Sequence, residues 1–221
     1  MKKSLIFTTI ALSLFLSTTL SISAQIINGS FENGPEAGSF LEAYNGGGIT
    51  GWTIDITNID YIGSYWQAAN GSRSVDLNGL HVASKISQFV PTVPGITYRV
   101  SFEMSGNPDG QPDVKTMTVT AADGSAQDYT YELTAENSKT NMLWEAKDYY
   151  FIAAAATTKL SFTSTTPDAF GPALDNVTIT TNDKICHRNN SPGVKTLTVG
   201  APAVAAHLAH GDTLGPCVVA Q

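Results

Sequence analysis

The most regular feature of this sequence is an alternation of apolar and polar residues with a period of two, which is typical of β-strands. It is plain in Tyr98, Val100, Phe102 and Met104. Nine segments share this pattern or an enrichment in threonine, valine, tyrosine and phenylalanine: 52–57, 72–77, 85–90, 96–104, 115–121, 128–133, 147–153, 159–164 and 174–180. No convincing amphipathic helix interrupts them. The pattern therefore predicts an all-β protein, an antiparallel sandwich of two sheets.

Three predicted loops are longer than hairpin turns, and loops on a rigid sandwich often carry binding residues. They cover residues 34–51, 58–71 and 106–113. The second loop is the most informative, because it is rich in aromatic and amide residues and ends where the predicted strand 72–77 begins. We expect that strand to place the loop at the rim of a sheet.

Aromatic and amide side chains in these loops are candidates for gripping a sugar. A pyranose ring presents C–H faces that stack on aromatic rings, and amides bond its hydroxyl groups. The candidate platform comprises Tyr44, Tyr61, Tyr65 and Trp66, with Gln67, Asn70 and Asn107 as amide partners. Trp52 and Trp144 are instead assigned to the core, because large aromatic residues tend to be buried.

The first residues predict export. Met1, Lys2 and Lys3 precede an apolar run over residues 5–20 and the small-residue segment Ser21-Ile22-Ser23-Ala24, the pattern of a secretory signal peptide. An uncleaved anchor is the alternative. Cleavage after Ala24 would leave a sandwich domain over residues 25–181 and a tail over residues 182–221.

The charge balance limits the partners. The formal net charge is −7, and loss of Lys2 and Lys3 with the signal peptide lowers it to −9. An acidic, charge-poor surface disfavours nucleic acid and anionic membranes, and is compatible with neutral polysaccharide or bound cations. No second apolar segment of spanning length follows, so we expect no membrane span in the mature protein. The oligomeric state is not predicted.

The tail holds both cysteines and three of the four histidines. A further strand over 194–199 and a short helix over 203–210 are expected. An exported protein with two cysteines usually forms a disulfide, so we favour a Cys186–Cys217 bridge. The alternative is a tetrahedral zinc site made of Cys186, His207, His210 and Cys217, with His187 as a substitute ligand.

Several motifs resemble the bacterial "choice-of-anchor C" extracellular proteins, which are similar to plant cell-wall proteins with a galactose-binding-like fold. They are Asn28-Gly29-Ser30-Phe31-Glu32, Gly51-Trp52, Asp60-Tyr61-Ile62-Gly63, Tyr65-Trp66, residues 71–79 and residues 171–177. The resemblance covers about residues 26–180. It implies a jelly-roll β-sandwich like that of many carbohydrate-binding modules, attached to extracellular or cell-wall polysaccharide. Members of that family often end in a membrane or sorting anchor, whereas this chain ends in its Cys/His tail.

A structural calcium site is implied by the same resemblance. Sandwiches of this class place the end of the first strand beside the start of the last one, which here brings Glu32 to Asp175. Two carboxylates with the backbone carbonyls of Asn70 and Arg73 would form an oxygen cage for Ca²⁺. The alternative is that both carboxylates cap turns or bond backbone amides.

Catalysis is not expected. A glycosidase needs a pair of carboxylates, and the candidates are Asp55, Asp60, Asp76, Asp109 and Asp113. Yet there is no serine nucleophile elbow, and before the tail only His81 could serve as an imidazole base. The sequence thus predicts an exported, non-catalytic carbohydrate-binding module. A structural or adhesive envelope protein is the first alternative, and a glycoside hydrolase the second.

Overall fold

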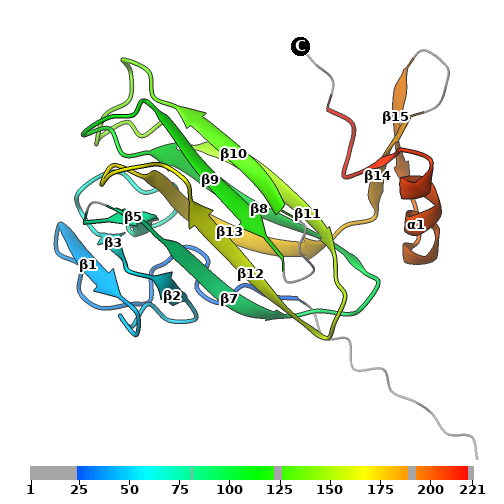
Figure 1. Ribbon diagram of the computed structural model, residues 1–221, viewed down its shortest axis with the longest axis horizontal. Helices are drawn as coiled ribbons and strands as arrows, with labels where there is room; N and C mark the ends of the chain where they lie inside the picture. The colour runs from blue at the N-terminus through cyan, green and yellow to red at the C-terminus, as the bar shows by residue number, and fades with distance from the viewer. Residues whose placement is uncertain (1–23, 81, 122–125, 189–192, 219–221) are drawn as a thin grey trace, which may run out of the picture.

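The computed structural model describes residues 24–80, 82–121, 126–188 and 193–218. In this part of the chain two antiparallel β-sheets pack face to face, and a small sheet with one helix follows them (Figure 1). Apart from Ala24, the predicted signal peptide lies outside the described residues, as does His81. No helix within the described ranges is long and apolar enough to cross a membrane.

Six strands form the first sheet, in the order β1-β3-β4-β13-β8-β11. Their bounds are β1 (Phe40–Tyr44), β3 (Asn58–Ile62), β4 (Ser74–Asp76), β8 (Thr97–Gly106), β11 (Glu145–Ile152) and β13 (Pro172–Thr181). The second sheet has the order β10-β9-β12-β7-β2. Its strands are β2 (Thr53–Ile56), β7 (Lys85–Pro91), β9 (Val114–Thr120), β10 (Ala126–Glu132) and β12 (Thr157–Ser164), and a short ladder pairs β5 (Asn78–Gly79) with β6 (Val82–Ala83). The predicted all-β, antiparallel jelly-roll β-sandwich is confirmed.

The core lies between the two sheets, where the alternating residues of each strand meet. Phe102 of β8 contacts Phe162 of β12, with ring centroids 5.3 Å apart. Trp52 is buried there as predicted, and its Nε1 donates to the carbonyl of Asn28 at 2.9 Å. Trp144 is not part of this core, since it is only partly buried against a second, smaller apolar cluster.

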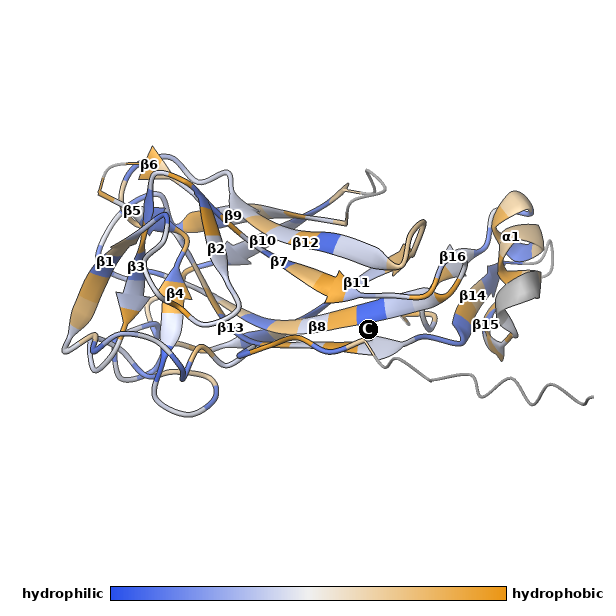
Figure 2. Ribbon diagram, turned by 90° about the horizontal axis from the view of Figure 1, so that it is seen from below, coloured by the Kyte–Doolittle hydropathy of each residue, from blue (hydrophilic) through white to orange (hydrophobic). Residues whose placement is uncertain are grey.

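The tail forms a separate small unit at one end of the sandwich, and Figure 2 shows it at the opposite end from β1, β3 and β4. It contains β14 (Lys184–Arg188), β15 (Val194–Thr198), α1 (Ala201–Ala209) and β16 (Thr213–Leu214), with β14 central in its sheet. Tail and sandwich touch where Gly215 lies against the Tyr150 ring. A Cβ at Gly215 would come within 2.7 Å of that ring, so only glycine allows the approach.

Candidate functional site

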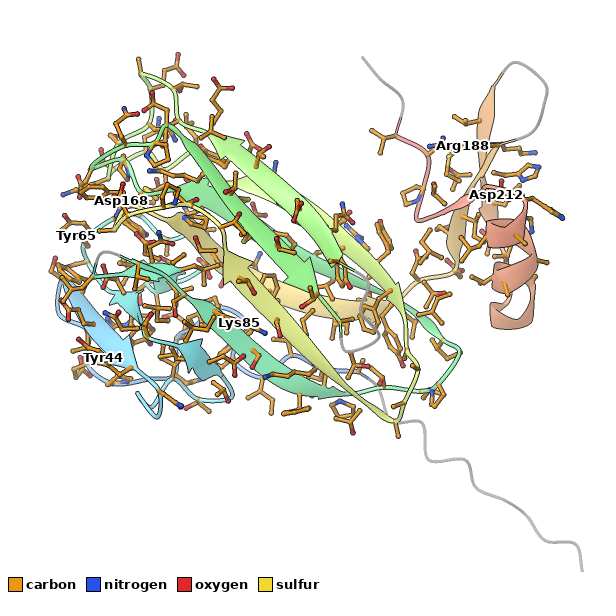
Figure 3. The ribbon with its side chains drawn as sticks, viewed as in Figure 1. Tyr44, Tyr65, Lys85, Asp168, Arg188 and Asp212 are labelled. Carbon is orange, nitrogen blue, oxygen red and sulfur yellow. A yellow bond between two sulfur atoms is a disulfide. The ribbon has the colours of Figure 1, made fainter. Side chains whose placement is uncertain are left out.

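A small cavity of about 140 Å³ lies at the end of the sandwich remote from the tail. Its walls come from β1, β3, the segment after β3, and two loops over residues 107–113 and 165–171. It is lined by Phe40, Asp60, Ile62, Tyr65, Trp66, Asn107, Asp109, Ala169 and Phe170. Figure 3 marks the region with the labels of Tyr65 and Asp168. Segments far apart in the sequence therefore converge on one hollow.

Tyr65 is fixed by both its hydroxyl group and its ring. The hydroxyl donates to Oδ2 of Asp109 at 2.5 Å, and the ring meets Phe40 edge-on at 5.2 Å between centroids. Nζ of Lys139 lies 3.9 Å from the centroid of the Tyr65 ring and 3.0 Å from Oδ2 of Asp109. The cation–π contact and the ion pair hold Tyr65 and Asp109 in one arrangement before any ligand arrives.

Trp66 forms a second aromatic wall. Only 4% of the residue is exposed, and its Nε1 donates to Oγ of Ser74 on β4 at 2.9 Å. The residue lines the small cavity and also a wider hollow of about 430 Å³ formed with residues 63–73. Its indole thus separates the small cavity from the wider, more open hollow.

Asp60 of β3 lines the cavity, and one of its carboxylate oxygens is an unpartnered acceptor. Its Oδ1 is buried, with no hydrogen-bond partner among the described residues. Desolvation, and secondarily the charge of Glu42, raise the pKa of Asp60 to about 6. A buried acceptor without a donor is costly, so the Asp60 carboxylate would gain from a hydrogen-bond donor in the cavity.

Asp76 faces Asp60 across the β3–β4 pair and holds the lining residue Asn107. It is fully buried, and this desolvation raises its pKa to about 7. The N–H of Asn78 donates to Oδ1 at 2.9 Å and Nδ2 of Asn107 donates to Oδ2 at 2.8 Å, both of which oppose the rise. The hydrogen bond to Asp76 thereby fixes the orientation of the Asn107 side chain.

Lys115 joins the two loops that wall the cavity. This lysine of β9 is fully buried, and its Nζ donates to the carbonyls of Gly110 at 2.8 Å and Phe170 at 2.7 Å. The loops also pack closely, because a Cβ on Gly110 would lie 2.3 Å from the Phe170 ring. The two loops that form these walls of the cavity are therefore held together by Lys115 and by close packing.

The structure brings together only part of the predicted platform. Tyr65, Trp66 and Asn107 line the cavity, although Trp66 and Asn107 are too buried to form an open surface. The prediction is wrong for Tyr61, whose ring is 0% exposed and whose hydroxyl donates to the carbonyl of Phe31 at 2.5 Å. Tyr61 lies on β3 rather than in a loop, and its ring belongs to the main core.

Two other platform candidates lie apart from the cavity. Tyr44 is exposed on β1, where its hydroxyl donates to Glu42 at 3.0 Å. Gln67 is exposed, and its carbonyl accepts a hydrogen bond from Nε1 of Trp144 at 3.0 Å. Neither residue is among those that line the cavity.

Sequence reasoning missed the role of six lining residues: Phe40, Asp60, Ile62, Asp109, Ala169 and Phe170. Asp60 and Asp109 were considered only as hydrolase carboxylates. The motif that contains Asp60 was visible in the resemblance, and this was the one signal that could have pointed to it. Nothing in the local pattern of Ala169 and Phe170 marks them as site residues.

Glu32 and Asp175 bond the same turn, as the calcium hypothesis required. However, Oδ2 of Asp175 accepts the N–H of Asn70 at 2.8 Å, and Oε1 of Glu32 accepts the N–H groups of Ser72 and Arg73, each at 2.8 Å. Calcium would need carbonyl oxygens where these N–H groups lie. The residues therefore fit the amide-bonding alternative better than a calcium cage, and calcium binding at this turn stays untested.

In the tail, Cys186 and Cys217 form the predicted disulfide, with Cα atoms 4.6 Å apart. The bridge excludes the zinc set of two cysteines with His207 and His210, because both sulfurs are already bonded. His210 is exposed at the end of α1, whereas His207 lies beside Asp212.

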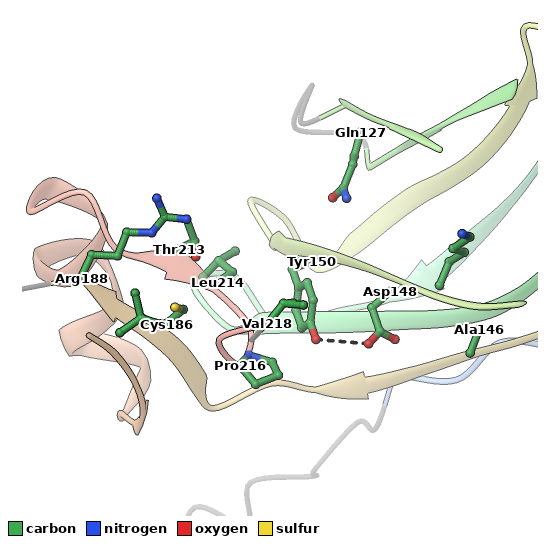
Figure 4. A pocket seen from close by; sticks show the side chains of 12 residues that line it. Gln127, Ala146, Asp148, Tyr150, Cys186, Arg188, Thr213, Leu214, Pro216 and Val218 are labelled. Carbon is green, nitrogen blue, oxygen red and sulfur yellow. Dashed lines mark hydrogen bonds between the residues drawn. The ribbon is translucent and has the colours of Figure 1, made fainter. Parts of the chain in front are cut away.

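A larger cleft of about 520 Å³ separates the tail from β11. Figure 4 shows its lining, in which Tyr150 bonds Asp148 at 3.4 Å, opposite Cys186 and Leu214 of the tail. Tyr150 is its one aromatic lining residue among those described. The cleft therefore lacks the convergence of rings and buried polar groups found in the small cavity.

Parts of this chain are similar to known proteins in sequence or in fold. Halomucin of Haloquadratum walsbyi is 29% identical in an alignment of 212 residues that covers 87% of this chain. The chain spans only about 2% of the length of that relative. The solved carbohydrate-binding module TmCBM61, in complex with β-1,4-galactotriose, is 18% identical with a TM-score of 0.45, covering 70% of this chain and 95% of that one. CBM35 from Paenibacillus barcinonensis is 20% identical with a TM-score of 0.42, covering 65% and 98%.

A family match defines what this chain is related to. The sequence model of the family described as "Protein of unknown function (DUF642)" matches residues 24–180, which span the whole sandwich. The tail lies outside the match, and the narrower resemblance to choice-of-anchor C proteins is not confirmed. Since the match covers well over half of the sequence, the chain belongs to the DUF642 family.

Proposed function

We propose that this protein is an exported, non-catalytic binding module that holds one neutral sugar residue of an extracellular polysaccharide in the 140 Å³ cavity. The observation that carries the proposal is the carboxylate of Asp60, which lines a hollow together with aromatic rings and has one buried oxygen without a donor. A sugar offers both complements at once, hydroxyl donors for the carboxylate and C–H faces for the rings.

The size of the cavity supports a single sugar residue. Sites for drug-sized ligands measure roughly 300–1,000 Å³, and this cavity is smaller. The wider hollow, which Trp66 also lines, offers room for the neighbouring sugar residues of the polysaccharide. The ligand is then a chain end or a branch whose last residue enters the cavity.

The charge of the cavity supports a neutral sugar. Asp60 and Asp109 both line it, and Lys139, the cation nearest to Tyr65, is already paired with Asp109. A uronic acid would bring a third negative charge beside these carboxylates. The net charge of −7 acts in the same direction over longer distances.

Glycan arrays followed by calorimetry on the best neutral oligosaccharide test this proposal. Tyr65→Ala removes a cavity ring and its bond to Asp109, and we expect it to weaken binding by at least about tenfold, the scale of one lost ring or charge-assisted hydrogen bond. Tyr44→Ala is the matched control, because Tyr44 is exposed on the same sheet outside the cavity; its affinity should stay unchanged.

Equal losses in the two variants, or an array without any signal, would reject the cavity as the sugar site. A silent array would favour a structural or adhesive envelope protein. Release of reducing sugar would instead indicate a hydrolase. We expect no release, because Asp109 is held by the Tyr65 hydroxyl and by Lys139 and is not free to act as a base or nucleophile.

Export is part of the proposal. The pattern over residues 1–24 is that of a signal peptide, and a disulfide such as Cys186–Cys217 persists in oxidising compartments. Mass spectrometry of the protein secreted by its native host should find Gln25 at the amino terminus.

A further inference from the structure

Two histidines and one aspartate converge in the tail, in a cluster that the sugar site does not use. Nδ1 of His187 lies 2.8 Å from Oδ2 of Asp212, and Nδ1 of His207 lies 2.7 Å from the same oxygen. The two imidazole rings stand edge to face, with centroids 5.6 Å apart. Both rings thus direct a nitrogen to one carboxylate oxygen.

The carboxylate is positioned by the fold rather than by the histidines alone. The side chain of Asp212 is 0% exposed, and its Oδ1 accepts the N–H of Arg188 at 2.7 Å. Figure 3 shows Asp212 and Arg188 beside α1. His187 follows the disulfide-bonded Cys186 on β14, and His207 lies in the last turn of α1. Three separate elements are therefore fixed around this point.

We propose that His187, His207 and Asp212 bind one Zn²⁺ ion. Their ligand atoms lie within 4.8 Å of one another. Zinc bonds of about 2.0–2.1 Å in a tetrahedron place ligand atoms roughly 3.3 Å apart, so the present nitrogen–oxygen pairs need to open by only about half an ångström. The imidazole side chains are 25% and 22% exposed, which leaves an approach from solvent and room for water as a fourth ligand.

The chemistry of the donors selects the class of metal. Two imidazole nitrogens and one carboxylate oxygen suit zinc and other late first-row ions, whereas calcium and magnesium prefer six or more oxygen ligands. Oδ1 of Asp212 accepts the N–H of Arg188, and a hydrogen bond of this kind outside the metal's own ligands orients the ligating carboxylate.

The tail also has a structural need for such an ion. Its buried apolar side chains, among the described residues, are Ile185, Cys186 and Val204. A unit with so small a core depends on cross-links. The disulfide joins β14 to the end of the chain, and a metal held by His187, His207 and Asp212 would join β14 to α1 and to the segment that follows it.

Calorimetric titration of the EDTA-treated, dialysed protein with ZnCl₂ tests the site, with CaCl₂ as the comparison ion. We expect one Zn²⁺ per chain and no calcium heat at this site. His187→Gln and His207→Gln should each weaken zinc binding by at least about tenfold. His210→Gln is the matched control, because His210 is exposed directly after the same helix and lies outside the cluster; it should bind zinc like the parent protein.

A second readout separates lost ligands from a misfolded tail. Absence of free thiols in each variant shows that the Cys186–Cys217 bridge has formed, and zinc should slow proteolysis of the tail in the parent protein and in His210→Gln only. The proposal is overturned if the parent protein binds no zinc, if the double variant of His187 and His207 binds it equally well, or if His210→Gln loses as much affinity as His207→Gln.

Discussion

At the scale of single residues, Lys115 is the position near the cavity where we expect a substitution to cost the most stability. Its buried ammonium satisfies the carbonyls of Gly110 and Phe170. Lys115→Met keeps much of the volume but leaves both acceptors without a donor. Because an unsatisfied buried acceptor costs about 1–3 kcal/mol, we expect the free energy of unfolding to fall by about 2–4 kcal/mol in urea titrations.

Lys85→Met is the control for Lys115→Met. Lys85 is partly exposed on β7, and surface substitutions of this kind change stability by about 0.5 kcal/mol or less. A loss in Lys115→Met no larger than that in Lys85→Met would show that the bonds from Nζ do not brace the two loops.

Single residues also show where sequence reasoning succeeds. Trp52 could be assigned to the core and Tyr65 to the site from their neighbours in the sequence, because each owes its position to a local turn and strand. Asp60 could not, since it lies between β1 and β4 in the sheet, and its unpartnered oxygen is a property of the assembled sheet. Tyr61 was misplaced for a related reason, as its strand was read as a loop.

At the scale of elements, the turn before β4 is held from two sides by carboxylates. Burial acts to raise the pKa of Glu32, but its hydrogen bonds together lower it: Oε1 accepts two backbone N–H groups, and Oε2 accepts the hydroxyl of Ser72 at 2.8 Å. Glu32→Ala should lower the free energy of unfolding by about 1–2 kcal/mol, as these bonds are charge-assisted but partly exposed. Glu36→Ala, at a side chain that is 99% exposed, should change little.

The same turn decides between calcium and amide bonding. Because N–H groups meet both Glu32 and Asp175, we expect EGTA to leave the melting temperature unchanged while Glu32→Ala lowers it. A melting temperature that falls with EGTA in the parent protein and not in Glu32→Ala would restore the calcium cage.

Elements with clear alternation were predictable, and those without it were not. All nine predicted sandwich strands are present, together with the tail strand and helix. The strands β1 and β3 were missed because neither alternates: β3 is buried on both faces, and β1 exposes Phe40 and Tyr44. Four of the nine lining residues lie on these two strands or directly after them: Phe40, Asp60, Ile62 and Tyr65. The site was therefore harder to predict than the fold.

At the scale of the whole molecule, three aspartates make stability depend on pH in an unusual direction. Burial raises the pKa of Asp60 to about 6 and those of Asp76 and Asp175 to about 7, above the 3.8 of the ordinary side chain. Between about pH 4 and 7 the folded protein therefore holds more protons than the unfolded chain. Their contribution to stability is complete at low pH and is lost as pH rises through 6 and 7.

We therefore expect the free energy of unfolding, measured in urea at constant ionic strength, to fall from pH 5 to pH 8. Glu32 and Asp212, whose pKa values are lowered, act in the opposite direction, but only below about pH 4.5. Asp60→Asn keeps the shape of the side chain and removes one titrating group, so the fall near pH 6 should become shallower. A stability that rises between pH 5 and 7 would contradict the raised pKa values.

Sugar binding should follow the opposite trend over the same range. An ionised Asp60 accepts a ligand hydroxyl more strongly than a protonated one, so affinity should increase as pH rises through about 6, and Asp60→Asn should remove this dependence. The cavity would then bind best where the sandwich is somewhat less stable than its maximum. This follows from burying a carboxylate that titrates near pH 6 beside the ligand, and calorimetry at pH 5 and pH 7.5 on the parent protein and Asp60→Asn measures it directly.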